Sequence, residues 1–176
     1  MNKPNKNVKN SLNLIWLVVT VICVFITYYC MKVKATNNYE QILQVAAEGC
    51  NLEITKFLVQ DILDINSTSS VSSKTLIHSA RGGCLEIIKF FVEKGVDINA
   101  TNGSTSKRTA LHHAAYVGRL EIVKLLLKKG ANPNVRDNDE KNPRDMAVIE
   151  SRHNKDKPYN EIISLLYNAD KQYKFE

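Results

Sequence analysis

The sequence repeats itself with a period of 33 residues, and this periodicity constrains the fold more than any other feature. When residues 41–67 are aligned with residues 74–100, the tripeptides Leu-Glu-Ile and Asp-Ile-Asn recur in step. A further shift of 35 aligns residues 85–99 with 120–134 and keeps Leu-Glu-Ile, the following Lys, a Lys-Gly pair and the closing Asn. The two extra residues fall in a stretch with the composition of a loop. Repeats of this length predict a solenoid of stacked supersecondary units.

Each unit has the pattern of a helix, a turn, a second helix and a loop. In the third unit, Thr109 is placed as the N-cap of a helix over 109–117, and Gly118 ends that helix. A second helix is predicted over 119–128, with Gly130 as its C-cap. The apolar positions predicted to face inward are Leu111, Ala114 and Ala115 on the first helix and Ile122, Val123, Leu125 and Leu126 on the second. Neither helix could bury its apolar face alone, so the units are expected to stack.

These patterns resemble the ankyrin repeat family. The third unit carries the most specific ones, T-A-L-H-H-A-A at 109–115, G-R-L-E-I-V-K-L-L-L at 118–127 and G-A-N-P-N at 130–134. The second unit keeps G-C-L-E-I-I-K-F-F-V at 83–92. In the degenerate first unit, Asp61-Ile62 replaces the Lys-Gly turn. The resemblance covers residues 39–169 and implies an all-α fold.

A fourth unit begins at Asp137, with N-P-R-D-M-A at 142–147 in the place of the first helix. Its second helix, predicted at 160–167, arrives late after a polar insertion. The whole prediction is an ankyrin-repeat solenoid of about four helix-turn-helix units with loop or β-turn connections, preceded by one transmembrane helix. The predicted organisation is a basic tail (1–11), a transmembrane helix or signal peptide (12–31), a linker (32–38), repeats at 39–70, 71–104 and 105–136, a degenerate capping unit at 137–170 and a C-terminal tail (171–176).

Residues 10–31 contain no charged side chain, and as a helix they would rise about 33 Å, close to the thickness of the bilayer's hydrocarbon core. Lysines flank both ends, with Trp16 near one end and Tyr28 and Tyr29 near the other, as at membrane interfaces. This predicts a single-pass membrane protein that contacts the bilayer through residues 12–31. The alternative is a signal peptide cleaved after Ala35, although the apolar run is longer than usual for one. Counting lysines favours a cytoplasmic N-terminus by a margin of about one charge.

The net charge of +6 arises mostly at the N-terminus. Five lysines and no acidic residue precede residue 35, so the remainder carries only +1. This excludes a basic nucleic-acid-binding surface as the default expectation, and no nucleic-acid partner is predicted. The abundance of Asn, Lys and Ile is typical of AT-rich genomes. As a membrane-linked ankyrin protein of this size, the chain resembles the ankyrin repeat proteins of intracellular bacteria.

The residues that could carry chemistry have structural interpretations. His112 occupies the place where the ankyrin pattern puts a histidine that ties the helix start to neighbouring backbone, and His113 points about 100° away from it. Cys50 and Cys84 fall at inter-helix turns, where we expect them to act as small turn-filling residues. Neither a metal site with cysteine spacing nor a phosphate loop is present in the sequence. We expect no enzyme activity, no metal, no cofactor and no small-molecule substrate.

The remaining candidate function is protein binding. In ankyrin proteins, partners usually meet the inter-repeat loops and the exposed side of the first helices. The resemblance therefore implies these partner-binding residues: Arg81, Lys107, Arg108, His113, Tyr116, Val117, Asn138, Asp139 and Lys141. The alternative is that they are ordinary solvated loop residues. The predicted function is a membrane-anchored protein–protein interaction module with an unidentified protein partner, and the alternative is a secreted or translocated soluble ankyrin effector released by cleavage after Ala35.

Overall fold

The computed structural model describes residues 39–62, 69–103 and 106–173. Its helices are residues 39–48, α2 (Leu52–Phe57), the π-helical turn η1 (Leu58–Ile62), α3 (Ser69–Gly82), α4 (Leu85–Glu93), α5 (Ala110–Val117), α6 (Leu120–Lys128), α7 (Pro143–Ser151) and α8 (Tyr159–Tyr173). The predicted transmembrane segment at 12–31 and the linker at 32–38 lie outside the described residues. Among the helices that are described, none combines the length and the apolar character needed to cross a bilayer.

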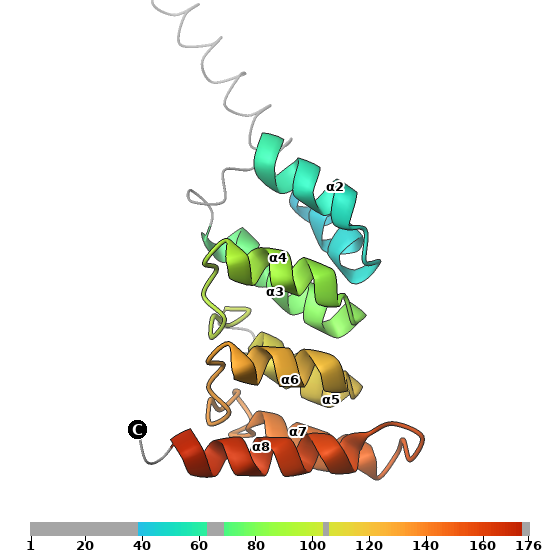
Figure 1. Cartoon of the computed structure of the whole chain (residues 1–176), viewed down its shortest axis with the longest axis vertical. Coiled ribbons are helices and arrows are strands. Elements are labelled where there is room, and N and C mark those ends of the chain that lie inside the picture. Colours follow the sequence, from blue (N-terminus) through green and yellow to red (C-terminus); the bar gives the residue numbers. More distant parts are fainter. Residues whose placement is uncertain (1–38, 63–68, 104–105, 174–176) are drawn as a thin grey trace, which may run out of the picture. The chain divides into compact units, whose positions relative to one another are not determined.

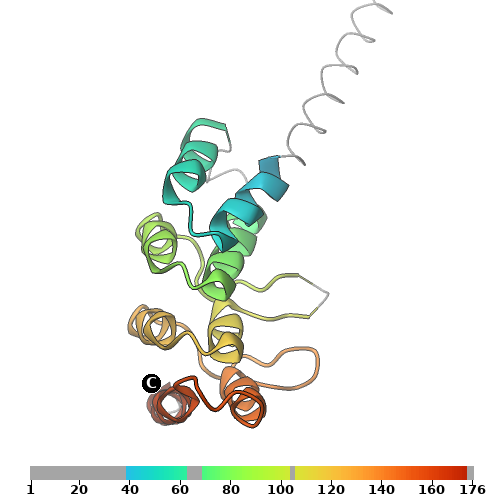
Figure 2. The ribbon, with the colours of Figure 1, turned by 90° about the vertical axis from the view of Figure 1, so that its right-hand side faces the viewer.

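The helices pair within each repeat, and the pairs stack in chain order within the compact unit that begins at Gln41 (Figure 1). The first helices form one row, in which α3 packs on α5 and α5 packs on α7. The second helices form another row, α2, α4, α6 and α8. Figure 2 shows the loops between repeats projecting on the side of the first helices. The all-α solenoid that the repeat pattern predicts is confirmed for the described residues.

Local capping fixes the starts of α5 and α7, the first at the predicted residue. Thr109 is the N-cap of α5: its side chain accepts from the His112 backbone N–H, and the His112 ring accepts from the Thr109 N–H. Asn142 and Asp145 form the same reciprocal pair at the start of α7. Such capping boxes satisfy backbone donors that the first helical turn would leave unpaired. Gly118 then ends α5 in the left-handed conformation, with φ of 79°.

The core lies between the two rows of helices and is lined by small side chains on the first helices. Leu111, Ala114 and Ala115 of α5 are buried, as predicted. On α6, Ile122, Val123 and Leu126 are buried, but Leu125 is only half-buried. The prediction that Leu125 lies fully inside is therefore wrong. The inward face of α6 consists of residues 122, 123 and 126. This stripe is narrower than the set of four residues that the sequence predicts.

The first repeat departs from the others. In place of the Lys-Gly turn, its second helix continues into the π-helical turn η1. Ile54 is 44% exposed, whereas Ile87 and Ile122, at the same position in the next two repeats, are buried at 1% and 2%. Ile42, Val45 and Phe57 are also exposed apolar residues of this repeat. Within the described residues no further repeat covers this face.

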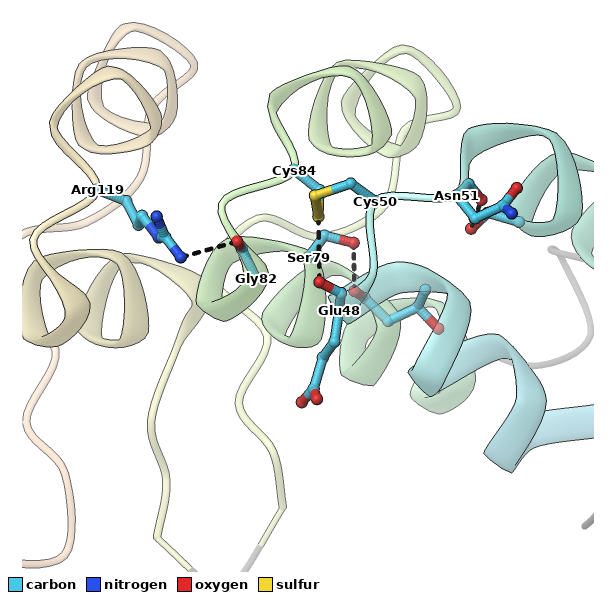
Figure 3. The surroundings of a disulfide bond; sticks show 9 residues. Glu48, Cys50, Asn51, Ser79, Gly82, Cys84 and Arg119 are labelled. Carbon is cyan, nitrogen blue, oxygen red and sulfur yellow. Dashed lines mark hydrogen bonds between the residues drawn. A yellow bond between two sulfur atoms is a disulfide. The ribbon is translucent and has the colours of Figure 1, made fainter.

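Cys50 and Cys84 are joined in a disulfide between the inter-helix turns of the first two repeats (Figure 3). Their Cα atoms lie 4.9 Å apart, because stacking places the second turn directly beside the first. The interpretation of these cysteines as turn-filling residues is therefore wrong. The sequence separation of 34, close to one repeat period, is the signal that they would be neighbours.

Candidate interaction surface

The loops before α5 and α7 are held together by a buried carboxylate. Arg108 donates from Nε to Asp137 Oδ2 over 2.9 Å, and the side chain of Asp137 is 1% exposed. The other oxygen of Asp137 accepts the backbone N–H groups of Asp139 and Lys141, over 2.9 and 3.0 Å. Burial alone would raise the pKa of Asp137, but these hydrogen bonds and the Arg108 charge outweigh it and lower the pKa. Asp137 is therefore a charged anchor for both loops.

Further hydrogen bonds fix the same loops to each other and to α5. The Asn138 N–H donates to the Ser106 carbonyl over 3.1 Å. The His112 ring lies 3.1 Å from the Lys141 carbonyl through Nε2, and its Nδ1 accepts from the Thr109 N–H, so Nε2 carries the proton. Burial lowers the pKa of His112, in keeping with a neutral ring. The predicted tie between this histidine and neighbouring backbone is confirmed.

We call Lys107, Arg108, Asn138, Asp139 and Lys141 the loop cluster. The structure brings these five predicted residues together across two adjacent loops, with Asp137 beneath them. Arg108 also approaches Asp139, at 3.7 Å. Lys107, Asn138 and Asp139 are exposed, while Arg108 and Lys141 are half-buried. The cluster thus presents both charges from two loops that hydrogen bonds at Ser106, Arg108 and Asp137 tie together.

We call Arg81, His113, Tyr116 and Val117 the α5 face, although Arg81 belongs to α3. The 35-residue spacing puts Arg81 and Tyr116 at equivalent positions of successive repeats. Tyr116 is 42% exposed, as predicted, and Arg81 is exposed. Backbone groups at the end of this face are already bonded, because the Tyr159 hydroxyl donates to the Tyr116 carbonyl and Lys157 Nζ donates to the Val117 carbonyl, each over 2.8 Å.

A carboxylate of the first repeat extends the α5 face. Glu48 occupies the position of Arg81 in the preceding repeat and lies 3.6 Å from the Arg81 guanidinium. The same carboxylate lies 2.6 Å from His78 Nδ1. Sequence analysis missed Glu48 and Asp137 because their roles depend on partners about one repeat away. The repeat period of 33 could have revealed the pair of Glu48 and Arg81, whereas the 29 residues between Arg108 and Asp137 do not match a repeat shift.

His113 lies mostly inside the α5 face rather than on it. Its Nε2 is buried and has no hydrogen-bond partner among the described residues. Burial, and then the positive charges of Arg108 and Arg81, lower the pKa of His113 to about 4. The ring is therefore neutral at neutral pH. It contributes shape to the surface rather than charge.

We expect the free energy of unfolding to fall between pH 7 and pH 5, with His113 as a main cause. The pKa of His113 rises from about 4 in the fold to its ordinary value of 6.5 in the unfolded chain. At pH 5 the unfolded state binds a proton that the folded state excludes, which costs the fold about 2 kcal/mol relative to pH 7. Urea denaturation at the two pH values measures the difference. His113→Gln should remove that part of it, whereas replacing the exposed His153 should not.

In residues 39–62, 69–103 and 106–173, no three His, Cys, Asp or Glu side chains gather closely enough to hold a metal ion. A family model described as ankyrin repeats, in three copies, matches the chain in three overlapping stretches, residues 18–102, 43–137 and 76–174. The first stretch begins inside the apolar run, and the last ends one residue after α8. A search of curated proteins gave no match.

Proposed function

The chain belongs to the ankyrin repeat family, a non-catalytic interaction fold, and on this premise we propose that it binds a protein partner through the α5 face and the loop cluster while anchored in a membrane. The observation that carries the proposal is the exposed pair Arg81 and Tyr116, at equivalent positions of adjacent first helices. Tyr and Arg are the residue types that most often dominate binding energy at interfaces.

The order within the loop cluster supports the same surface. Asp137 holds Arg108, Asp139 and Lys141 through three hydrogen bonds, so a partner would meet these residues already tied in place. Loops that are already ordered reduce the entropy cost of association. Asp139 and Lys107 are then available at the rim, where charges steer a partner more than they hold it.

The proposal is tested with Tyr116→Ala in the full chain. Tyr116 is on the surface, so we expect thermal stability to remain within about 1 kcal/mol of the unmodified chain. Binding to the protein that the full chain captures from its own cells should weaken by about 1–2 kcal/mol, or roughly 5- to 30-fold. Lys128→Ala, on the outer side of α6, is the matched control and should change neither quantity. Unchanged binding by a stably folded Tyr116→Ala variant would remove the α5 face from the proposal.

The membrane part of the proposal is supported by the uncharged run at 10–31, with lysines at both ends. Lys32–Tyr39 would span at most about 27 Å if fully extended, so the repeats would work close to the bilayer. A partner that is itself at the membrane surface suits this arrangement.

We expect the full chain to sediment with membranes and to resist alkaline extraction, because about 20 apolar residues across a bilayer are not released by high pH. N-terminal sequencing of the same material accompanies the extraction. Soluble protein beginning at Met1 would contradict the anchor. Soluble protein beginning near Thr36 would instead support the secreted effector.

A further inference from the structure

Cys50 and Cys84, which form the disulfide, each occupy a position where another residue would suit the turn better if there were no bond. Cys50 has φ of 59°, a left-handed conformation, and the aligned residues of the next two repeats are Gly83 and Gly118. Glycine adopts that conformation without the steric cost that a side chain brings. A cysteine at residue 50 is therefore unfavourable for the turn by itself.

The second cysteine gives up local stabilisation as well. Cys84 is the N-cap of α4 and makes no side-chain capping bond. At the equivalent position of the first repeat, Asn51 accepts from the Ile54 N–H over 3.0 Å. In the third repeat, Arg119 also makes no capping bond but donates to the Gly82 carbonyl of the preceding repeat over 2.9 Å (Figure 3). Cys50 in the first repeat and Cys84 in the second thus each lack a stabilising feature that other repeats have. Only a bond between the two sulfur atoms compensates for both.

The surrounding contacts hold the two turns together independently of the bond. Gly82 packs so closely on the Glu48 backbone that a Cβ there would collide with it. Glu48 also reaches His78 and Arg81 of the next repeat. Cys84 Sγ lies 3.6 Å from the Glu48 carbonyl, where a reduced thiol could donate a hydrogen bond. These contacts favour the same placement of the two turns as the bond does, and the exposed side of Cys50 leaves the pair open to exchange.

Disulfides of this kind form and persist in oxidising compartments, whereas the cytosol keeps thiols reduced. We propose that the repeat domain of this chain is exported and that Cys50 and Cys84 are oxidised there. The reaction is exchange with the disulfide of a thiol oxidoreductase. The two thiols lose two protons and two electrons to that disulfide, one S–S bond forms in the chain, and the oxidoreductase is left as a dithiol.

For a chain anchored through residues 12–31, export fixes the orientation. Lys3, Lys6 and Lys9 stay on the cytoplasmic side and the α5 face meets its partner outside. This orientation rests on the proposed anchor, but oxidation of the cysteine pair does not, since a cleaved and secreted chain would carry the same bond. Neither the orientation nor the oxidation of the cysteines depends on which protein the repeats bind.

The test uses the full chain in its own cells, quenched with acid and blocked with a maleimide before lysis. We expect Cys50 and Cys84 to escape labelling until a reductant is added, and peptide mass spectrometry to recover the two cysteine peptides linked. Protease supplied to the non-cytoplasmic side of sealed membranes should remove the repeats of an anchored chain while sparing the N-terminal segment. Both thiols labelled without reductant, or repeats cleaved only from the cytoplasmic side, would overturn the proposal.

Cys50→Gly is the informative variant, because it removes the sulfur and restores the residue that the turn favours. It should abolish the linked peptide and lower the midpoint of thermal unfolding by several degrees. Dithiothreitol should lower the midpoint of the unmodified chain but leave that of Cys50→Gly unchanged. If Cys50→Gly instead raises the midpoint of chain purified from its own cells without reductant, the bond is absent there and the proposal is wrong. Partner binding is read separately, so its loss or retention does not affect this result.

Discussion

Leu126→Ala is expected to lower the free energy of unfolding by about 2–5 kcal/mol, the range for deleting a fully buried leucine side chain. Leu126 is 0% exposed and lies on α6, which packs on both α4 and α8. Because each repeat depends on its neighbours for burial, we expect the loss to spread beyond α6. Urea denaturation measures the free energy, and amide exchange in α4 and α8 measures the spread.

Leu125→Ala is the matched control, since it makes the same substitution one position away on the same helix. Leu125 is only half-buried, so its truncation should cost clearly less than that of Leu126. A larger loss for Leu125 than for Leu126 would mean that the inward face of α6 is misassigned. Loss of protection confined to α6 in the Leu126 variant would contradict the interdependence of the repeats.

Asp137→Ala is expected to cost about 3–5 kcal/mol, because it leaves Arg108 without its buried partner and leaves two loop N–H groups unpaired. The stabilisation by this carboxylate has a defined pH range. Its pKa is lowered in the fold, so the contribution is complete above the unfolded value of 3.8 and is lost as the pH falls through the lower folded value. Urea denaturation at neutral pH measures the loss for the variant.

Asp139→Ala serves as the comparison for Asp137→Ala. Asp139 is 65% exposed and lies 3.7 Å from the same arginine, so its loss should change stability by less than about 1 kcal/mol. It belongs to the loop cluster, and any effect that it has should appear in partner binding. Equal destabilisation by the two variants would contradict the anchoring role of Asp137.

The parts of the fold that follow from local sequence could be predicted. Thr109, Asn142 and Gly118 occupy positions where a cap or a left-handed residue is required, and the helices start or end there. The inward face of α6 was less certain, because Leu125 and Leu126 both fit an apolar stripe. The neighbouring helices α4 and α8 select between them, and no local pattern contains that information.

Only part of the candidate interaction surface could be predicted from the sequence. Tyr116 is exposed because its helix position alone turns it outward. The lowered pKa of His113 and the partner of Arg108 depend instead on groups that other repeats bring close, among them Arg81 and Asp137. No local pattern marks the bond between Cys50 and Cys84, and only their separation of about one repeat period brings the two turns together.

The bond between the first two repeats also determines how the chain would respond to tension. A pull between the N-terminal segment and the C-terminus would pass through the two sulfur atoms and bypass the 34-residue separation between Cys50 and Cys84. The closed loop would keep about 110 Å of chain from extending, even if the force unfolded the helices inside it. For a domain anchored in a bilayer as proposed and held by a partner at its other end, the chain after Cys84, from α4 to α8, becomes the extensible part. The reach of the tether then depends on whether the two cysteines are oxidised.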